Sequence, residues 1–302
     1  MHVHVIYTGG TIGMVDSPRG LVPGADLEGW LTRLLDRPRT PGASQGGPGP
    51  DDVTLTSLDP LIDSSNATPA SWQQVIDTVR ALAALGTGPA TPSTGSATPG
   101  TGPAAFVVLH GTDTLAYTAA LLALALHGLD KPLVLTGAQR PFAAAGSDAP
   151  RNLATAAAAL AAGRPQAVIA FNGKLFPAVG SSKCSTESDD GFANPHFGTL
   201  DNPPPQRPSE KAQTRFSDGL TVLPIDPQAQ VLCLTLIPGF AAQQAADTLR
   251  QTSVRAAVLQ SYGHGNAPDD AAFADAVRAY TARGGLLLNI SQVPHGRAAA
   301  LY

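Results

Sequence analysis

The stretch Val3-His4-Val5-Ile6-Tyr7-Thr8-Gly9-Gly10-Thr11 joins an apolar run to a glycine turn that presents a threonine. A second stretch, Phe106-Val107-Val108-Leu109-His110-Gly111-Thr112-Asp113-Thr114, repeats this arrangement later in the chain. Continuous apolar runs are typical of parallel strands that are buried on both faces. Ligands of parallel α/β sheets bind beyond the carboxyl ends of the strands. Both turns are therefore candidates for the walls of a single pocket.

Apolar runs alternate with helical patterns along the whole chain. Predicted strands cover residues 3–8, 53–58, 105–110, 132–136, 167–171, 231–236, 256–260 and 286–290. Predicted helices cover residues 26–36, 69–85, 114–128, 150–162, 240–250 and 269–283. This alternation predicts an α/β fold with a larger, mostly parallel N-terminal sheet domain of the flavodoxin or Rossmann kind and a smaller C-terminal α/β domain.

Three segments rich in proline and glycine interrupt the alternation. Arg37–Pro50 and Gly86–Pro103 hold too few apolar residues to offset the entropy of ordering, so we expect solvated surface insertions there. The third segment, Leu200–Pro227, precedes a new strand-helix pattern. We expect an N-terminal catalytic domain over residues 1–200, a linker over 201–227 and a smaller domain over 228–302.

Composition narrows the class of protein. The chain has 302 residues, 43% hydrophobic content and a formal net charge of −4, which gives no electrostatic reason to expect nucleic acid or membrane partners. The first strand starts at His2, which leaves no space for a signal peptide, and the apolar run Ala119–Leu126 is much shorter than the roughly 20 residues of a membrane span. Cys184 and Cys233 form no metal or disulfide motif. We expect a cytoplasmic protein.

The first turn contains a candidate nucleophile. Gly9 and Gly10 let the backbone turn sharply and approach a ligand, and Thr11 places a hydroxyl beside exposed backbone N–H groups. A threonine hydroxyl is a poor nucleophile unless a neighbouring group activates it. The alternative is a plain Gly-Gly turn whose threonines bond their own backbone. Neither a GxGxxG nor a P-loop pattern is present, so a nucleotide-binding turn fits less well.

Two further turns carry polar groups at predicted strand ends. Thr112 adds a second hydroxyl, and Asp113 places a carboxylate at the start of a helix, where the dipole favours the ionised form. Asp63, Ser64 and Ser65 follow the second strand and could bind a carboxylate through hydroxyls and amides. Simple capping explains either turn alone. Their shared position after successive strands places all three turns at one edge of the sheet.

Several motifs together resemble the bacterial L-asparaginases, most closely the cytoplasmic type I enzymes. The resemblance runs in order from residue 3 to about residue 296, broken chiefly by the two proline-rich and glycine-rich insertions. The motifs are Tyr7-Thr8-Gly9-Gly10-Thr11-Ile12-Gly13-Met14, Pro60-Leu61-Ile62-Asp63-Ser64-Ser65, Leu109-His110-Gly111-Thr112-Asp113-Thr114-Leu115-Ala116-Tyr117-Thr118, Leu135-Thr136-Gly137-Ala138-Gln139-Arg140-Pro141 and Ser261-Tyr262-Gly263-His264-Gly265-Asn266-Ala267-Pro268.

The resemblance implies that the chain hydrolyses L-asparagine to L-aspartate and ammonia through a threonyl acyl-enzyme, without a metal or organic cofactor. Thr11 matches the family's nucleophile, and Thr112, Asp113 and Lys183 match its second catalytic group. Asp113 would also bind the substrate's α-ammonium group, and Asp63, Ser64 and Ser65 would bind its α-carboxylate. Judged without the resemblance, Lys183 is an ordinary loop lysine. The resemblance also implies a homodimer or homotetramer.

Two departures from the family pattern keep other functions open. Leu21 stands where the family usually has a loop tyrosine beside the nucleophile, and a leucine cannot relay a proton. The chain ends at Tyr302, where relatives usually continue, so the smaller domain is expected to be truncated and the strand at 286–290 to expose apolar surface. The alternatives are a glutaminase or amidotransferase-type relative, which one methylene separates from an asparaginase, and a catalytically impaired amino-acid-binding protein.

Overall fold

The computed structural model describes residues 1–18, 20–23, 27, 31, 52–85, 102–201, 219–296 and 298–299. The chain folds into two compact units, Met1–Pro227 and Gln228–Tyr302. Apart from residues 27 and 31, the helix predicted over 26–36 lies outside the described ranges, as does the insertion Arg37–Pro50. Most of the insertion at 86–103 and of the linker predicted over 201–227 also lies outside them.

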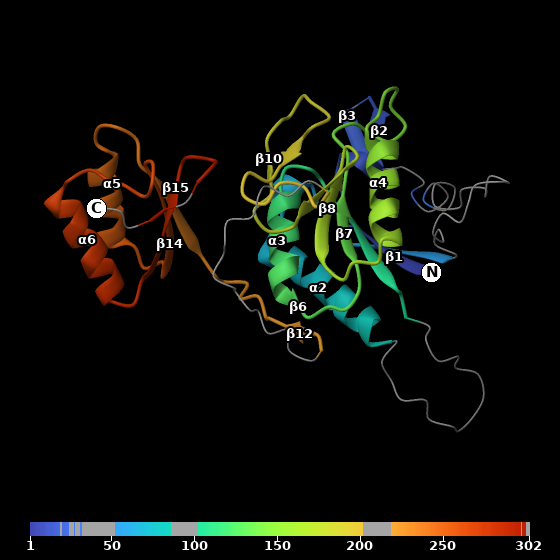
Figure 1. The fold of residues 1–302 in the computed structure, drawn as a ribbon, viewed down its shortest axis with the longest axis horizontal. Helices are drawn as coiled ribbons and strands as arrows, with labels where there is room; N and C mark the ends of the chain where they lie inside the picture. Colours follow the sequence, from blue (N-terminus) through green and yellow to red (C-terminus); the bar gives the residue numbers. More distant parts are fainter. Residues whose placement is uncertain are drawn as a thin grey trace, which may run out of the picture. The chain divides into compact units, whose positions relative to one another are not determined.

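A six-stranded sheet forms the centre of the first unit (Figure 1). In spatial order its strands are β4 (Asp52–Ser57), β1 (His2–Tyr7), β5 (Ala105–Leu109), β7 (Leu133–Thr136), β8 (Ala167–Phe171) and β9 (Lys174–Pro177). The first five are parallel, and β9 runs antiparallel to β8. The predicted mostly parallel α/β fold is confirmed. From β1 the chain goes first to β4 on one side and then to β5 on the other, which is the flavodoxin-like order.

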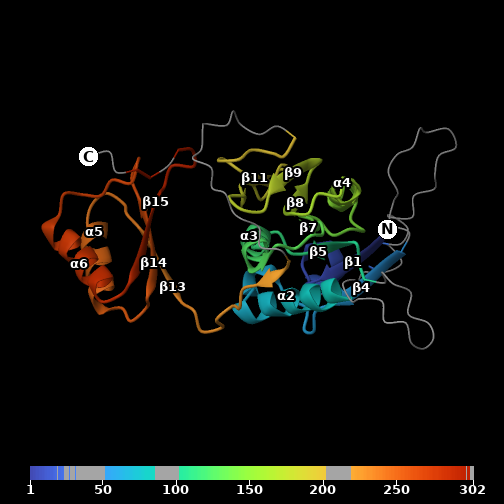
Figure 2. The same ribbon diagram turned by 60° about the horizontal axis from the view of Figure 1, so that its bottom comes forward.

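Helices cover both faces of this sheet, and a hydrophobic core lies on each side (Figure 2). On one face are α2 (Pro69–Ala84) and α3 (Leu115–Ala125), which bury Ile76 and Leu122. On the other face α4 (Ala149–Ala161) buries Leu153. Because both faces are covered, the central strand β5 is apolar throughout, and all five of its residues are buried.

Several short elements were not predicted from the sequence. They are the antiparallel edge strand β9, the hairpin of β2 (Met14–Ser17) and β3 (Gly20–Pro23), the hairpin of β10 (Ser182–Lys183) and β11 (Phe192–Ala193), the pair of β6 (Leu126–His127) and β12 (Thr221–Val222), and the 3-10 turns η1 (Thr11–Gly13) and η2 (Ser64–Asn66). The helix predicted over 114–128 ends earlier, at Ala125, because Leu126 and His127 pair with β12.

The second unit is a smaller α/β layer. Three parallel strands, β13 (Val231–Thr235), β14 (Ala256–Ser261) and β15 (Leu286–Ser291), lie in that order. The helices α5 (Ala241–Gln251) and α6 (Ala271–Ala282) enclose a core with the sheet that includes Leu249, Leu259 and Tyr280. Leu286 and Leu288 of β15 are 69% and 57% exposed. In the described part of both units, no helix has the length and apolar character needed to cross a membrane.

Candidate active site

Three polar turns meet at the carboxyl edge of the main sheet. They follow β1, β4 and β5, which are neighbours in the order β4-β1-β5. Tyr7 lies opposite Ser57 on one side and Leu109 on the other, so the three strands end at the same level. After β1 the chain adds β4 on one side of the sheet and β5 on the other. The gap between β1 and β5 is therefore a topological switch point, which is where open α/β sheets bind ligands.

Glycines allow the three turns to touch one another. Gly9 and Gly10 have φ angles of 122° and 95°, in the region that side chains disfavour. A Cβ atom on Gly10 would lie 2.5 Å from the Gly111 Cα, and one on Gly111 would lie 2.4 Å from the Ser64 Oγ. A Cβ on Gly9 would lie 2.1 Å from the Ile62 carbonyl oxygen. The close approach of the turns therefore requires glycine at each of these positions.

Hydrogen bonds fix the same contacts. The Thr8 hydroxyl donates to the Leu109 carbonyl at 3.1 Å, and the Ile62 N–H donates to the Thr8 carbonyl at 2.8 Å. The Thr114 hydroxyl donates to the Ser64 carbonyl at 2.7 Å and makes no side-chain capping bond at the start of α3. Capping alone thus does not account for the second turn, since Thr114 connects it to the turn after β4.

A polar cavity of about 320 Å³ opens between the turns. It is lined by Gly10, Thr11, Met14, Asp63, Ser64, Gly111, Thr112, Asp113, Gln139, Lys183 and Thr186. The structure therefore brings together all the residues singled out from the sequence except Ser65. That residue is exposed beside the cavity, and its N–H donates to the Asp63 carboxylate at 3.2 Å, so Asp63 does cap the short turn η2.

Lys183 reaches the second turn from a distant part of the sequence. It lies in β10, and its ammonium group is 2.8 Å from the Thr112 Oγ1 and 2.7 Å from the Asp113 Oδ1. The side chain of Lys183 is only 18% exposed, whereas that of Asp113 is 60% exposed. Its position is therefore not that of an ordinary loop lysine, because a carboxylate and a hydroxyl of the same turn hold its charged end.

His110 is a satisfied structural histidine rather than a cavity residue. Its side chain is 1% exposed, with Nδ1 2.8 Å from the Gly111 carbonyl oxygen and Nε2 2.9 Å from the Thr118 hydroxyl. Burial lowers the pKa of the imidazole below its ordinary value, against a smaller opposing effect of the bond to Gly111. The neutral ring holds the backbone of the turn that carries Thr112.

Sequence reasoning missed three side chains of the cavity wall. Gln139 follows the carboxyl end of β7, so the rule that located the other turns could have found it. Met14 opens β2 and ends the first of the motifs that resemble the family, but no role in the cavity was expected for it. Thr186 belongs to the loop after Lys183 and had no signal in the sequence. Leu21, the departure from the family pattern, lies in β3 opposite Asp16.

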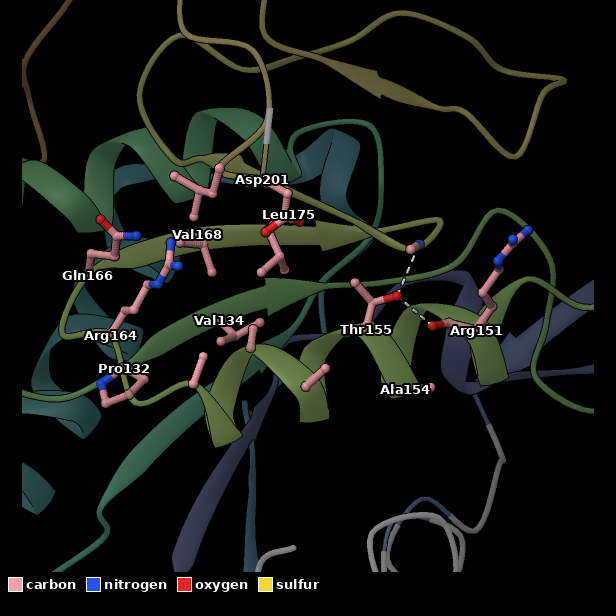
Figure 3. Close-up of a pocket in the computed structure, with 15 residues that line it drawn as sticks. Pro132, Val134, Arg151, Ala154, Thr155, Arg164, Gln166, Val168, Leu175 and Asp201 are labelled. Atoms are coloured by element: carbon pink, nitrogen blue, oxygen red, sulfur yellow. Dashed lines mark hydrogen bonds between the residues drawn. The ribbon is translucent and has the colours of Figure 1, made fainter. Parts of the chain in front are cut away.

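A larger cleft lies elsewhere in the first unit and is not this site (Figure 3). It measures about 490 Å³ and runs along α4 beside β8 and β9, with Val134, Val168 and Leu175 among its apolar lining residues and Arg164 at one end. None of the residues predicted to be functional lines it. Among the described residues, no group of three or more His, Cys, Asp or Glu side chains could hold a metal ion.

One family model and several known proteins match this chain. The family model described as "Asparaginase, N-terminal" matches residues 2–87 and 98–210. The chain is 34% identical to L-asparaginase 1 of Escherichia coli, over 98% of this chain and 80% of that protein. It is 29% identical to the 60 kDa lysophospholipase of Mus musculus, over 98% of this chain and 52% of that protein. The crystal structure of L-asparaginase I from Vibrio cholerae superposes with a TM-score of 0.78 at 30% identity, covering 99% of this chain and 83% of that one.

Proposed function

Since this chain belongs to the asparaginase family and is an enzyme of the L-asparaginase type, we propose that it hydrolyses L-asparagine to L-aspartate and ammonia through Thr11. One observation carries the assignment of residues. Thr11 and Thr112, which are far apart in sequence, line the same polar cavity, and Lys183 and Asp113 form an ion pair beside Thr112. We place the reaction in the N-terminal domain.

The proposed reaction has two displacement steps. The Thr11 hydroxyl attacks the side-chain carboxamide carbon, its proton goes to the leaving nitrogen, and ammonia departs from a β-acyl-enzyme ester. Water then attacks the ester, L-aspartate leaves, and the proton of the water restores the Thr11 hydroxyl. Two easier steps replace one difficult amide hydrolysis. Backbone N–H groups beside Thr11 and Thr112 would stabilise the oxyanion, each by about 3 kcal/mol.

Charged groups around the cavity support the orientation of the substrate. Asp113 is acidic and exposed on the cavity side, which suits an α-ammonium group, and the Ser64 hydroxyl with the backbone of the η2 turn suits an α-carboxylate. Lys183 donates to the Thr112 hydroxyl, so we assign these two groups to proton transfer with the attacking water. No metal or organic cofactor has a part in this scheme.

The decisive experiment measures ammonia release from L-asparagine and L-glutamine side by side, with L-aspartate as the control. We expect hydrolysis of L-asparagine by the wild type and none by Thr11→Ala, whose fold should stay intact by circular dichroism. Thr78→Ala, on α2, which contributes no residue to the cavity, should keep full activity. Near wild-type turnover in Thr11→Ala would reject the nucleophile.

The same assay separates the alternatives. A preference for L-glutamine would favour a glutaminase. The measurement is needed because the two substrates differ by one methylene, which is worth only about 1–3 kcal/mol in a simple pocket. Thermal stabilisation by L-asparagine without ammonia release would favour a binding protein.

We also propose a cytoplasmic homo-oligomer, dimer or tetramer. The motif resemblance to type I enzymes supports that proposal, and native mass measurement tests the assembly.

A further inference from the structure

Lys183 is held on a hairpin that is too short to be stable alone. Its strands β10 and β11 pair through two residues each, Ser182 with Ala193 and Lys183 with Phe192. An isolated two-stranded hairpin is marginal in water even when it is longer. The position of Lys183 at the cavity therefore depends on what holds the loop between the two strands, residues 184–191.

We propose that two aspartates at the tip of this loop latch the hairpin to the main sheet and thereby position Lys183 for the reaction. The latch consists of Asp189 with Arg140 and of Asp190 with Lys174 and Asn172. The effect on catalysis rests on the proposed function. The residues of the latch touch no reacting group, so they are positioning residues.

The first half of the latch joins the hairpin to the loop after β7. The Arg140 Nη2 lies 2.5 Å from the Asp189 Oδ1, and the Gln139 side-chain amide donates to the Ser188 carbonyl at 2.6 Å. The hydrogen bond that Arg140 donates to the Asp189 carboxylate raises the pKa of Arg140. Arg140 is itself anchored, because its Nε donates to the Gly146 carbonyl at 2.8 Å. The tip thus bonds to a fixed guanidinium and to a side chain of the cavity wall.

The second half joins the hairpin to the turn between β8 and β9. The Asp190 Oδ1 accepts hydrogen bonds from the Lys174 ammonium and the Asn172 side-chain amide, both at 2.7 Å. Those bonds, that of Lys174 first, lower the pKa of the Asp190 carboxyl. The turn is fixed to α4, because the Gly173 N–H donates to the Thr155 hydroxyl at 3.0 Å (Figure 3).

The hairpin is consequently held at its base and at two points of its tip. At the base, Lys183 bonds to Thr112 and Asp113, and Phe192 is buried. The ion pairs of the tip are substantially exposed, so their loss should change global stability very little. A small displacement of a catalytic group can nevertheless slow a reaction strongly, because rate depends on alignment at the scale of one ångström. Catalysis should therefore respond to the latch far more than stability does.

The test compares kcat, KM and melting temperature for Asp189→Asn and Asp190→Asn. We expect each variant to lower kcat for L-asparagine about tenfold, with KM and melting temperature close to wild type. The charge-reversed double variant Lys174→Asp/Asp190→Lys should recover part of that loss. The matched control is Asp77→Asn, which removes the exposed Asp77–Arg80 pair on α2 and should leave kcat unchanged.

A second readout keeps this test separate from the proposed function. The acetylation rate of Lys183, followed residue by residue with mass spectrometry, should rise in both latch variants and not in Asp77→Asn. Unchanged kcat and unchanged acetylation would overturn the latch while leaving the asparaginase assignment in place. If the wild type releases no ammonia, the proposed function fails, and faster acetylation in the two variants would still support the latch as the support of Lys183.

Discussion

At the scale of single residues, Gly111 is the point where the turns after β4 and β5 press together. A Cβ atom there would lie 2.4 Å from the Ser64 Oγ and 2.7 Å from the Ser64 Cβ. Gly111→Ala must therefore push the two turns apart, which we expect to cost about 1–3 kcal/mol of unfolding free energy, as overpacking usually does. Urea denaturation measures this loss, and ammonia release should fall with it because Thr112 moves.

Ser64→Gly provides the matched variant for this contact. It removes both atoms that the new methyl group would strike, so the double variant Gly111→Ala/Ser64→Gly should be more stable than the sum of the two single effects predicts. Strict additivity of the two free-energy changes would contradict the contact. Ammonia release needs no recovery in the double variant, since Ser64 also belongs to the proposed carboxylate site.

His110 gives the protein a predictable dependence on pH. Because the Gly111 carbonyl can only accept, Nδ1 carries the proton of the neutral ring, and Nε2 accepts from the Thr118 hydroxyl. Burial keeps the pKa of His110 in the folded state below the ordinary histidine value of about 6.5. Between the folded pKa and 6.5 the unfolded chain binds more protons, so stability is complete above that window and falls as the pH is lowered through it.

We expect the unfolding free energy to decrease from pH 7.5 to pH 5.5, with His110 contributing at most about 1.4 kcal/mol per pH unit. His4, whose pKa burial also lowers, adds a contribution of the same sign. His110→Asn should reduce the slope below pH 6.5 and leave the slope between pH 7.5 and 8.5 unchanged. Urea titrations at each pH give both slopes. If the slope below pH 6.5 were the same in His110→Asn as in the wild type, His110 would not contribute to the pH dependence of stability.

At the scale of elements, α2 begins at the N-cap that the sequence predicts. The Thr68 hydroxyl accepts from the Ser71 N–H at 3.4 Å, the Ser71 hydroxyl oxygen accepts from the Thr68 N–H at 3.0 Å, and Pro69 follows as the first helical residue. Thr68→Ala should lower the unfolding free energy by about 1 kcal/mol, the usual effect of losing an N-cap. KM for L-asparagine should not change, because α2 contributes no residue to the cavity. A shift in KM would mean that the cap acts on the site.

The elements predicted from the sequence are those that periodicity and capping define. β5 and β8 are continuous apolar runs, β1 is apolar apart from its two histidines, and Thr68 with Pro69 fixes the start of α2 within one residue. The hairpin of β10 and β11 has no such signal, because two-residue strands show no periodicity and its loop is held by Arg140 and Lys174 from distant segments. The family resemblance could thus indicate that Lys183 belongs to the site, but the sequence could not show how it is held there.

At the scale of the whole molecule, the position of the cavity follows from the order of strands. Thr11, Asp63 and Thr112 follow β1, β4 and β5, and the parallel order β4-β1-β5 brings these ends side by side. The sequence predicted this edge because three polar turns follow successive strands. It could not predict the glycine contacts at Gly10 and Gly111, since each depends on the distance between segments that are remote in the chain.

In the second unit, the two faces of the parallel sheet differ in how far their leucines are buried. Leu259 in β14 faces the core with α5 and α6 and is 4% exposed, whereas Leu288 in β15 is 57% exposed. Parallel sheets are usually covered on both faces, so exposed leucines on such a strand favour self-association. Leu288→Ala should change the unfolding free energy by less than about 0.5 kcal/mol and reduce light scattering at high protein concentration. The matched variant Leu259→Ala should instead lose about 2–5 kcal/mol, as a buried leucine does. A comparable loss in both variants would mean that the β15 side chain is buried in solution, and the face would then have to be regarded as a covered one.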